Sequence, residues 1–299
     1  MINTAAIRDL CKPGLNTIFG DYPMYPAQWT EIYERHTADK AVEIDVEIKM
    51  LGLAQLKNEG ANTAYDSMGQ RYMTNYVSRY VGLGFIITRQ AIRDNLYKSR
   101  FPMQAKALRQ SFEQTKEVQG AAVLNNGFDT NYPIGDGKPL FSTTHPRDGG
   151  TVANKPSVDV DLNETALEDA VIAIQIFRNA AGLRCMTKPM KVLTGVYNQF
   201  AIERLMTTKG RVETANNDIN ALVSTNAFPQ GYRINQFFTD ADAWYVKTDA
   251  PDGFKYFERE PMETSMYTDP DNDNLKVKGI ERYAFGVSNF RCAYGSQGQ

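Results

Sequence analysis

Residues 135–146 read Gly-Asp-Gly-Lys-Pro-Leu-Phe-Ser-Thr-Thr-His-Pro, and this stretch narrows the fold and the function more than any other. It places Ser142 and His145 in a loop rich in glycine and proline, a setting in which catalytic residues are often found. A serine hydrolase also needs a group that orients its base, and no Gly-x-Ser-x-Gly turn surrounds Ser142. We therefore expect no catalytic residue here. A turn at His145-Pro146 is favoured, and a hydrolase centred on Ser142 and His145 stays an alternative.

The composition is that of an ordinary globular chain. Of the 299 residues, 42% are hydrophobic and 23% are charged, and this length suffices for a sizeable core and two domains. The longest apolar stretch, Val81–Ile87, is far too short to cross a membrane, so we expect no membrane partner. The 33 basic and 35 acidic residues leave a net charge of -2, which disfavours a protein that depends on gripping phosphates.

Metal-binding and cofactor-binding patterns are incomplete. The spacing Asp269-x-Asp271-x-Asp273 opens like a calcium loop, but the sixth position is Asn274 and the twelfth is Ile280, where the bidentate glutamate belongs. A hairpin turn is favoured instead. The cysteines are few and widely spaced, which indicates free thiols in a reducing compartment: Cys11, Cys185 and Cys292. We expect neither a metal nor a cofactor.

The N-terminal third is predicted to be extended. Prolines and glycines break up residues 1–28, which therefore form a loose tail or an arm that lies on a neighbour. Strict alternation of apolar and charged residues over 42–49 predicts a strand. A second β-rich run covers about 71–88, so the simplest assembly is one long two-stranded hairpin over 40–87 with a mobile tip. An isolated hairpin is marginal in water, so we expect its apolar face to contact another subunit through Val42, Ile44, Val46 and Ile48.

A long helix is predicted next. Thr88 caps a short run from Arg89, and Pro102 suits the first turn of a second run that reaches about Asn125. Phe112 lies on the apolar stripe of that helix. Its basic residues are candidates for facing DNA, although the solvated side of an amphipathic helix is the favoured interpretation: Lys106, Arg109 and Lys116.

The remaining chain alternates helix and strand and then becomes β-rich. Asp161 or Asn163 starts a helix, 191–195 is a short buried strand, and 196–206 is a further helix. Two hairpins are predicted in the last third. In the first, 244–248 and 254–259 flank a turn at 251–253, and in the second, 261–267 and 275–286 flank 269–274.

Four segments resemble the major capsid proteins of Mu-like tailed phages: Gly84–Ile92, Gly135–Pro146, Leu183–Gly195 and Phe290–Ser296. The chain departs from that pattern at Gln90 and Arg93, where acidic residues are more usual. The resemblance implies an α+β fold of the Hong Kong 97 capsid type. It implies an N-terminal arm (1–39), an extended β-hairpin loop (40–87), a peripheral domain with a long spine helix (88–159 and 256–299) and an axial domain (160–255).

The resemblance also implies what the chain does. Subunits would form hexamers and pentamers in an icosahedral shell around double-stranded phage DNA, held by weak, non-specific contacts, in a virion assembled in the host cytoplasm. Portal protein and a separate scaffold protein would be partners, and no enzymatic activity is expected. A shell of the same fold that encloses protein cargo, as encapsulins do, is the alternative within this fold. No position here identifies a crosslinking pair.

Overall fold

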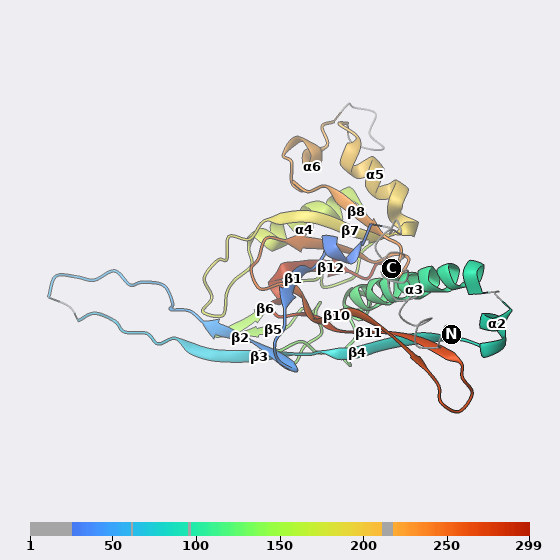
Figure 1. Ribbon diagram of the computed structural model, residues 1–299. Coiled ribbons are helices and arrows are strands. Elements are labelled where there is room, and N and C mark those ends of the chain that lie inside the picture. The colour runs from blue at the N-terminus through green and yellow to red at the C-terminus, as the bar shows by residue number, and fades with distance from the viewer. Residues whose placement is uncertain (1–25, 61, 95–96, 211–217) are drawn as a thin grey trace.

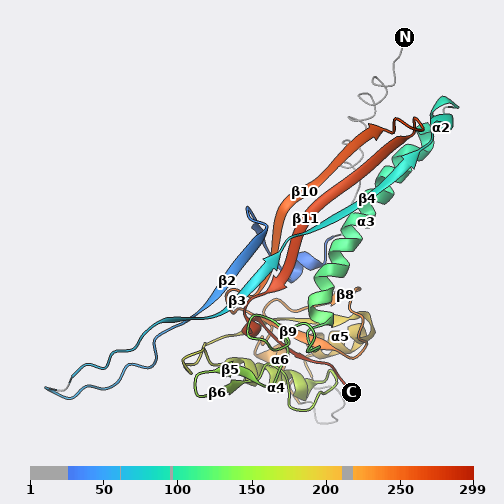
Figure 2. The same cartoon turned by 90° about the horizontal axis from the view of Figure 1, so that it is seen from below.

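The computed structural model describes residues 26–60, 62–94, 97–210 and 218–299, with the backbone alone for 97–101. The N-terminal arm expected at 1–39 therefore lies largely outside the described residues. Figures 1 and 2 show a body built around two sheets, with the hairpin projecting from it on one side.

The first sheet has the strand order β1-β10-β11-β4, and its long strands lie along helix α3 (Figure 2). β1 pairs with β10 in parallel, and the other pairs are antiparallel. The turn 269–274 joins β10 and β11 as a hairpin, which confirms the second hairpin predicted from the sequence. The elements are β1 (Glu34–Thr37), β4 (Arg79–Ile87), α2 (Arg89–Arg93), α3 (Tyr97–Asn125), β10 (Phe254–Thr268) and β11 (Leu275–Val287).

The second sheet has the order β12-β9-β7-β8, with helices α4, α5 and α6 around it (Figure 1). Asn163 caps α4, because its Oδ1 accepts a hydrogen bond from Ala166 N at 2.8 Å. The elements are α4 (Glu164–Gln175), β7 (Pro189–Gly195), α5 (Gln199–Thr207), α6 (Ala221–Ser224), β8 (Tyr232–Asn235), β9 (Trp244–Thr248) and β12 (Ala293–Ser296). Short 3-10 turns cover Trp29–Glu31, Val196–Asn198 and Phe290–Cys292.

The projecting hairpin is shorter than predicted. β2 (Val42–Lys49) pairs with β3 (Gly69–Val77) and ends there, and β4 leaves the hairpin to pair with β11. The single hairpin over 40–87 is thus wrong in its second half. β2 is too short to pair with the whole 71–88 run, and the long β11 supplies the remaining backbone partners. A smaller hairpin, β5 (His145–Arg147) with β6 (Gly150–Val152), follows the long helix.

Two further predictions are corrected. Helix α3 begins at Tyr97, so Pro102 lies in its second turn and not at its first residue. A proline there costs one hydrogen bond near the end of a long helix, which the remaining turns tolerate. The strands β9 and β10 do not form a hairpin, because the turn at 251–253 carries the chain from one sheet to the other.

One contiguous core joins the two sheets. It includes Trp29 near the N-terminal side, Leu124 of α3, Val192 of β7 and Tyr256 of β10. Because this core is shared, the two sheets are packed together as one body. The segment 256–299, which we assigned to the peripheral domain, contributes strands to both sheets, because β10 and β11 belong to the first sheet and β12 belongs to the second.

Candidate functional site

Ser142 and His145 lie in a loop that is held in place by packing and by buried hydrogen bonds. His145 is fully buried, and its ring stacks on Phe290 at a centroid distance of 3.8 Å. Its Nδ1 lies 2.6 Å from Asp136 Oδ2, and its Nε2 lies 3.1 Å from Asn154 Oδ1 and 3.2 Å from Leu140 O. Both ring nitrogens therefore have oxygen atoms within hydrogen-bond distance, and the ring is held from both sides.

Asn154 ties the same loop to the end of the chain. Its side chain is buried, and Nδ2 donates to Leu140 O at 2.7 Å, Phe290 O at 3.1 Å and Ala293 O at 3.2 Å. Its Oδ1 accepts a hydrogen bond from Ser142 N at 2.8 Å. Buried polar groups that are all partnered in this way fix one conformation of a loop.

Ser142 is not arranged as a nucleophile. Its Oγ accepts a hydrogen bond from Thr144 N at 3.2 Å, whereas His145 uses both ring nitrogens on other acceptors. The pairing of Asp136 with His145 has the form of two members of a catalytic triad, but the serine is not placed on the free side of the ring. The arrangement therefore provides no support for the hydrolase alternative.

The hairpin turns its charged face, not its apolar face, towards the body of the subunit. Asp45 Oδ2 lies 2.7 Å from Lys255 Nζ, and Glu47 Oε1 lies 3.1 Å from Arg291 Nη1. The third pair, further along the strand, joins Lys49 Nζ to Asp148 Oδ2 at 2.8 Å. These three partners come from β10, from the turn before β12 and from the β5–β6 turn.

The apolar face of the hairpin is consequently left towards solvent. Ile44 is 57% exposed, Ile48 is 54% exposed, and Val42 and Val46 are partly exposed. β3 adds Met73 opposite Val46 and Val77 opposite Val42, both more than half exposed. We call Val42, Ile44, Val46, Ile48, Met73 and Val77 the outer face. An apolar strip of this kind on a subunit marks a surface that another molecule covers.

The Asp45 pair predicts a dependence of stability on pH. Burial by itself would raise the pKa of the Asp45 carboxyl, but hydrogen bonds from Lys255 and Ser288 and the charge of Lys255 lower this pKa overall. The ionised carboxylate therefore stabilises the fold above about pH 4, the usual aspartate range, and this contribution disappears as the pH falls through the lowered pKa. We expect Asp45→Asn to lower the urea midpoint of unfolding at neutral pH, with a difference from the wild type that shrinks in acid. If the difference in urea midpoint between Asp45→Asn and the wild type were the same at neutral and strongly acidic pH, this account would be contradicted.

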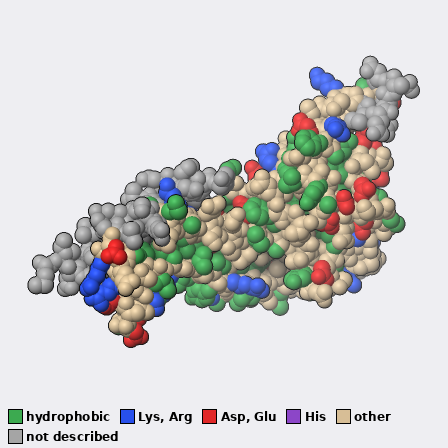
Figure 3. Space-filling model, turned by 90° about the vertical axis from the view of Figure 1, so that its right-hand side faces the viewer, with side chains coloured by type: hydrophobic (Ala, Val, Ile, Leu, Met, Phe, Trp, Pro, Cys, Tyr) green, Lys and Arg blue, Asp and Glu red, His purple; other side chains and the backbone are tan. Residues whose placement is uncertain are grey.

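The three residues of α3 that the sequence suggested for contact with DNA differ in their surroundings. Lys106 is exposed, and Arg109 Nε lies 3.2 Å from Glu113 Oε1. The side chain of Lys116 is only 12% exposed, and its Nζ lies 2.8 Å from the buried Glu281 of β11. Burial raises the pKa of Glu281, although Lys116 acts in the opposite direction. Lys116 is therefore engaged inside the subunit. Figure 3 shows basic and acidic side chains interspersed with hydrophobic ones over one face of the molecule.

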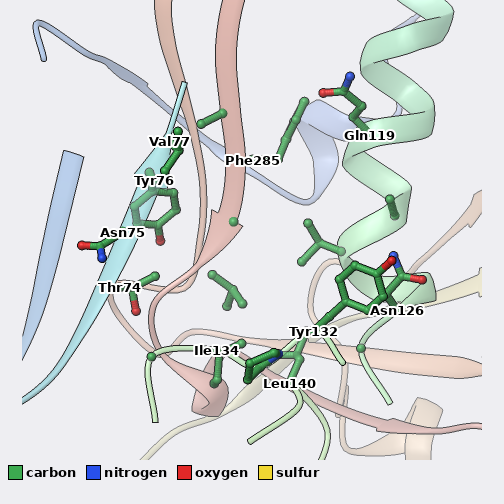
Figure 4. A pocket seen from close by; sticks show the side chains of 18 of the residues that line it. Thr74, Asn75, Tyr76, Val77, Gln119, Asn126, Tyr132, Ile134, Leu140 and Phe285 are labelled. Carbon is green, nitrogen blue, oxygen red and sulfur yellow. The ribbon is translucent and has the colours of Figure 1, made fainter. Parts of the chain in front are cut away.

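An open groove of about 710 Å³ lies between β3, the end of α3 and the loop that follows it. Figure 4 shows Tyr132, Ile134 and Leu140 at one end of the groove, with Thr74 and Tyr76 on the strand and Gln119 on the helix. Its polar lining consists of amides, Thr74, Arg79 and the tyrosines Tyr76, Tyr132 and Tyr283. Among the described residues, no carboxylate, histidine, lysine or cysteine lines the groove, so the groups that most often act as a general base or a nucleophile do not meet there.

Neither a metal-binding cluster nor a membrane-spanning helix is found in the described part of the chain. Among these residues, no group of three or more histidine, cysteine, aspartate or glutamate side chains is placed to hold a metal ion. In the turn 269–274, Asp269 pairs with Lys276, and Asp273 pairs with Arg89, the first residue of α2. No described helix is both long enough and apolar enough to span a bilayer.

A family model described as phage capsid protein matches residues 72–296, well over half of the chain. The chain belongs to this family. The matched segment contains most of β3, all of β4 and α3, the His145 loop, the second sheet and the first sheet except β1. It starts after β2, the first strand of the hairpin. No curated protein matches the sequence.

Solved capsid structures share the fold of this phage capsid protein. The mature capsid of bacteriophage PhiM1 matches with a TM-score of 0.57 at 12% identity, covering 92% of this chain and 88% of that one. The capsid of Myoviridae phage XM1 matches with a TM-score of 0.54 at 11% identity, covering 93% of this chain and 94% of that one. A virus-like particle from Pyrococcus furiosus matches with a TM-score of 0.54 at 11% identity, covering 95% of this chain and 97% of that one. These matches confirm the α+β capsid fold expected from the sequence.

Sequence reasoning missed several residues that hold this capsid subunit together. Asp136 lies in the stretch that suggested a catalytic loop, yet its pairing with His145 was not expected. Lys255 and Arg291, which receive the hairpin, carry no local pattern that marks them. Asn154 sits in a loop rich in polar residues, where a buried asparagine does not differ from a solvated one by sequence.

Proposed function

We propose that the chain is the major capsid (head) protein of a Mu-like tailed phage and assembles through hexamers and pentamers into an icosahedral shell around double-stranded DNA. The observation that carries this proposal is the outer face of the hairpin in a chain of the phage capsid protein family. A projecting two-stranded ribbon has no core of its own, so its exposed apolar side chains need a second copy to cover them.

The same reasoning gives the other parts of the proposal. A protein shell of this type sits in the virion and is built in the host cytoplasm, with a portal protein and a separate scaffold protein as further partners. The near-balanced charge of the chain favours weak, non-specific contacts with the packaged DNA. Lys106, which is exposed on α3, is a candidate for such a contact.

Electron microscopy of particles formed by the expressed chain, with an assay for nuclease-protected DNA after co-production with a cognate phage packaging system, tests this function. Closed shells that protect DNA support the proposal. Closed shells that contain protein cargo and exclude DNA would favour the encapsulin-like alternative, for which the likeness to the virus-like particle from Pyrococcus furiosus is the supporting observation. A monomer at every concentration tested would refute both.

Charging the outer face is expected to stop assembly while leaving the subunit folded. Ile44 is more than half exposed in the subunit, so Ile44→Asp places its carboxylate in water until a neighbour arrives. Covering it then costs several kcal/mol at each copy, because an unpaired charge is removed from water. We expect wild-type circular dichroism and a sedimentation profile shifted to small species.

Ile44→Val is the matched control for this variant. It keeps the site apolar and β-branched, so assembly should persist. Normal shells from Ile44→Asp would mean that the outer face is not a contact. An unfolded Ile44→Asp subunit would instead place Ile44 in the core of the subunit.

A further inference from the structure

The contacts that hold the hairpin against the rest of the subunit are mainly ion pairs, and they include little apolar packing. Among the described residues of β2, β3 and the loop between them, Tyr76 is the only buried hydrophobic side chain. Its ring packs on Phe257 of β10 at a centroid distance of 4.7 Å, and its hydroxyl contacts Ser288 Oγ. This small cluster lies at the root of the hairpin and acts as a pivot.

Beyond the pivot, charged residues at alternate positions of β2 each contact a different part of the body. Asp45 pairs with Lys255, Glu47 pairs with Arg291, and Lys49 pairs with Asp148. Alternate residues of a strand share one face, so the three pairs form a single row.

The pairs differ in their exposure to solvent along this row. The side chains of Lys255 and Arg291 are 10% and 6% exposed, whereas Asp148 is 48% exposed. Exposed pairs contribute little to stability, and removing one partner of a buried pair is costly. The two inner pairs must therefore carry most of the restraint, and the outer pair can open first.

We propose that this row is an electrostatic latch: Asp45 and Glu47, held by Lys255 and Arg291, keep the hairpin at one angle to the body, and loss of these pairs frees it to swing about Tyr76. The use of such a latch rests on the proposed function, since the hairpin needs a neighbour only in a shell. A latched arm presents its outer face in one direction, and a released arm can follow a neighbour that moves.

The latch is tested on single subunits, so its failure is distinct from a failure of the shell proposal. Genetically encoded ketone residues replace the exposed Leu56 at the hairpin tip and the exposed Glu203 on α5, and spin labels on them report the distance from tip to body. We expect one narrow distance distribution in the wild type at low salt. We expect the loss of this single distance in Asp45→Asn/Glu47→Gln.

Glu43→Gln is the matched control. It removes the same charge from the same strand, but the hydrogen bonds that Glu43 accepts within the described part of the chain come from the neighbouring Asp39 N and Lys40 N. We expect it to keep the narrow distribution. At about 1 M salt we expect the distribution of the wild type to stay narrower than that of Asp45→Asn/Glu47→Gln, because partly buried pairs are screened less than exposed ones.

The outcomes decide the proposal in either direction. If Asp45→Asn/Glu47→Gln does not fold because Arg291 is left buried without its carboxylate partner, Asp45→Asn/Glu47→Gln/Arg291→Gln removes that charge together with both carboxylates and is measured instead. A folded, latch-deficient variant with a broad distribution supports the latch. A distribution as narrow as that of the wild type would show that the backbone alone fixes the hairpin, and the latch would be rejected.

Discussion

Replacing His145 by alanine is expected to lower the free energy of unfolding by about 3–5 kcal/mol, because it leaves the buried carboxylate of Asp136 without its partner. The variant also removes the ring that stacks on Phe290 and one partner of Asn154 Oδ1. The loop then loses one of its contacts with the 3-10 turn before β12, while Asn154 still donates to Phe290 O and Ala293 O. Chemical denaturation followed by circular dichroism measures the loss, and reduced yield of soluble protein should accompany it.

Ser142→Ala is the matched control within the same loop. It removes an oxygen that accepts from Thr144 N, while Ser142 N keeps its bond to Asn154. The expected loss is about 0.5–1.5 kcal/mol, the usual contribution of one hydrogen bond. Equal stability of His145→Ala and the wild type would contradict the structural role of the histidine. A hydrolytic activity that disappears in folded Ser142→Ala protein would restore the hydrolase alternative.

Breaking α3 at Phe112 should unfold the subunit. A proline in the interior of a helix costs about 3 kcal/mol or more, and deletion of a buried phenylalanine ring costs about 3–5 kcal/mol. The ring of Phe112 lies over Gly279 of β11, where an added Cβ would come within 2.9 Å of the ring. Together these losses approach the whole stability of an ordinary domain. We expect Phe112→Pro to be insoluble or to lack cooperative thermal unfolding.

Two single variants separate the causes of that effect. Phe112→Ala keeps the helix and removes the ring, whereas Gln114→Pro breaks the helix at an exposed position and deletes no buried side chain. Each should be destabilised by about half as much as Phe112→Pro, to the extent that neighbouring changes add. Soluble, assembly-competent Phe112→Pro protein would refute the assignment of α3 as the continuous spine of the subunit.

Local patterns in the sequence were enough to predict most of the secondary structure. The alternation at 42–49 predicted β2 with its observed bounds, and β9 was predicted at Trp244–Thr248 as observed. Asn163 was recognised as one of two candidates for the start of α4, because a side-chain oxygen there can accept from a free helical N–H. These features depend on residues that are close together in the chain, and so they are readable without the fold.

Pairing between distant segments was less predictable. The sequence predicted that the 71–88 run pairs with 42–49, but only the fold decided that β3 alone does so and that β4 pairs with β11. The same holds for the turn at 251–253, which resembles a hairpin turn and in fact connects two sheets. Turn chemistry specifies a change of direction, whereas the choice of partner strand depends on the energy of the whole sheet.

By itself, the sequence determined that β2 has one apolar and one charged face, that a long helix carries Phe112 on its buried side, and that the 135–146 stretch belongs to a capsid-like chain. Only the tertiary structure decided which face of β2 turns inward and that His145 is a buried support. The reason is that Lys255, Arg291 and Asp148 lie far from β2 in sequence, and Phe290 lies far from His145. A charged face is buried only where the fold brings opposite charges to it, and the local sequence does not show which distant residues will supply those charges.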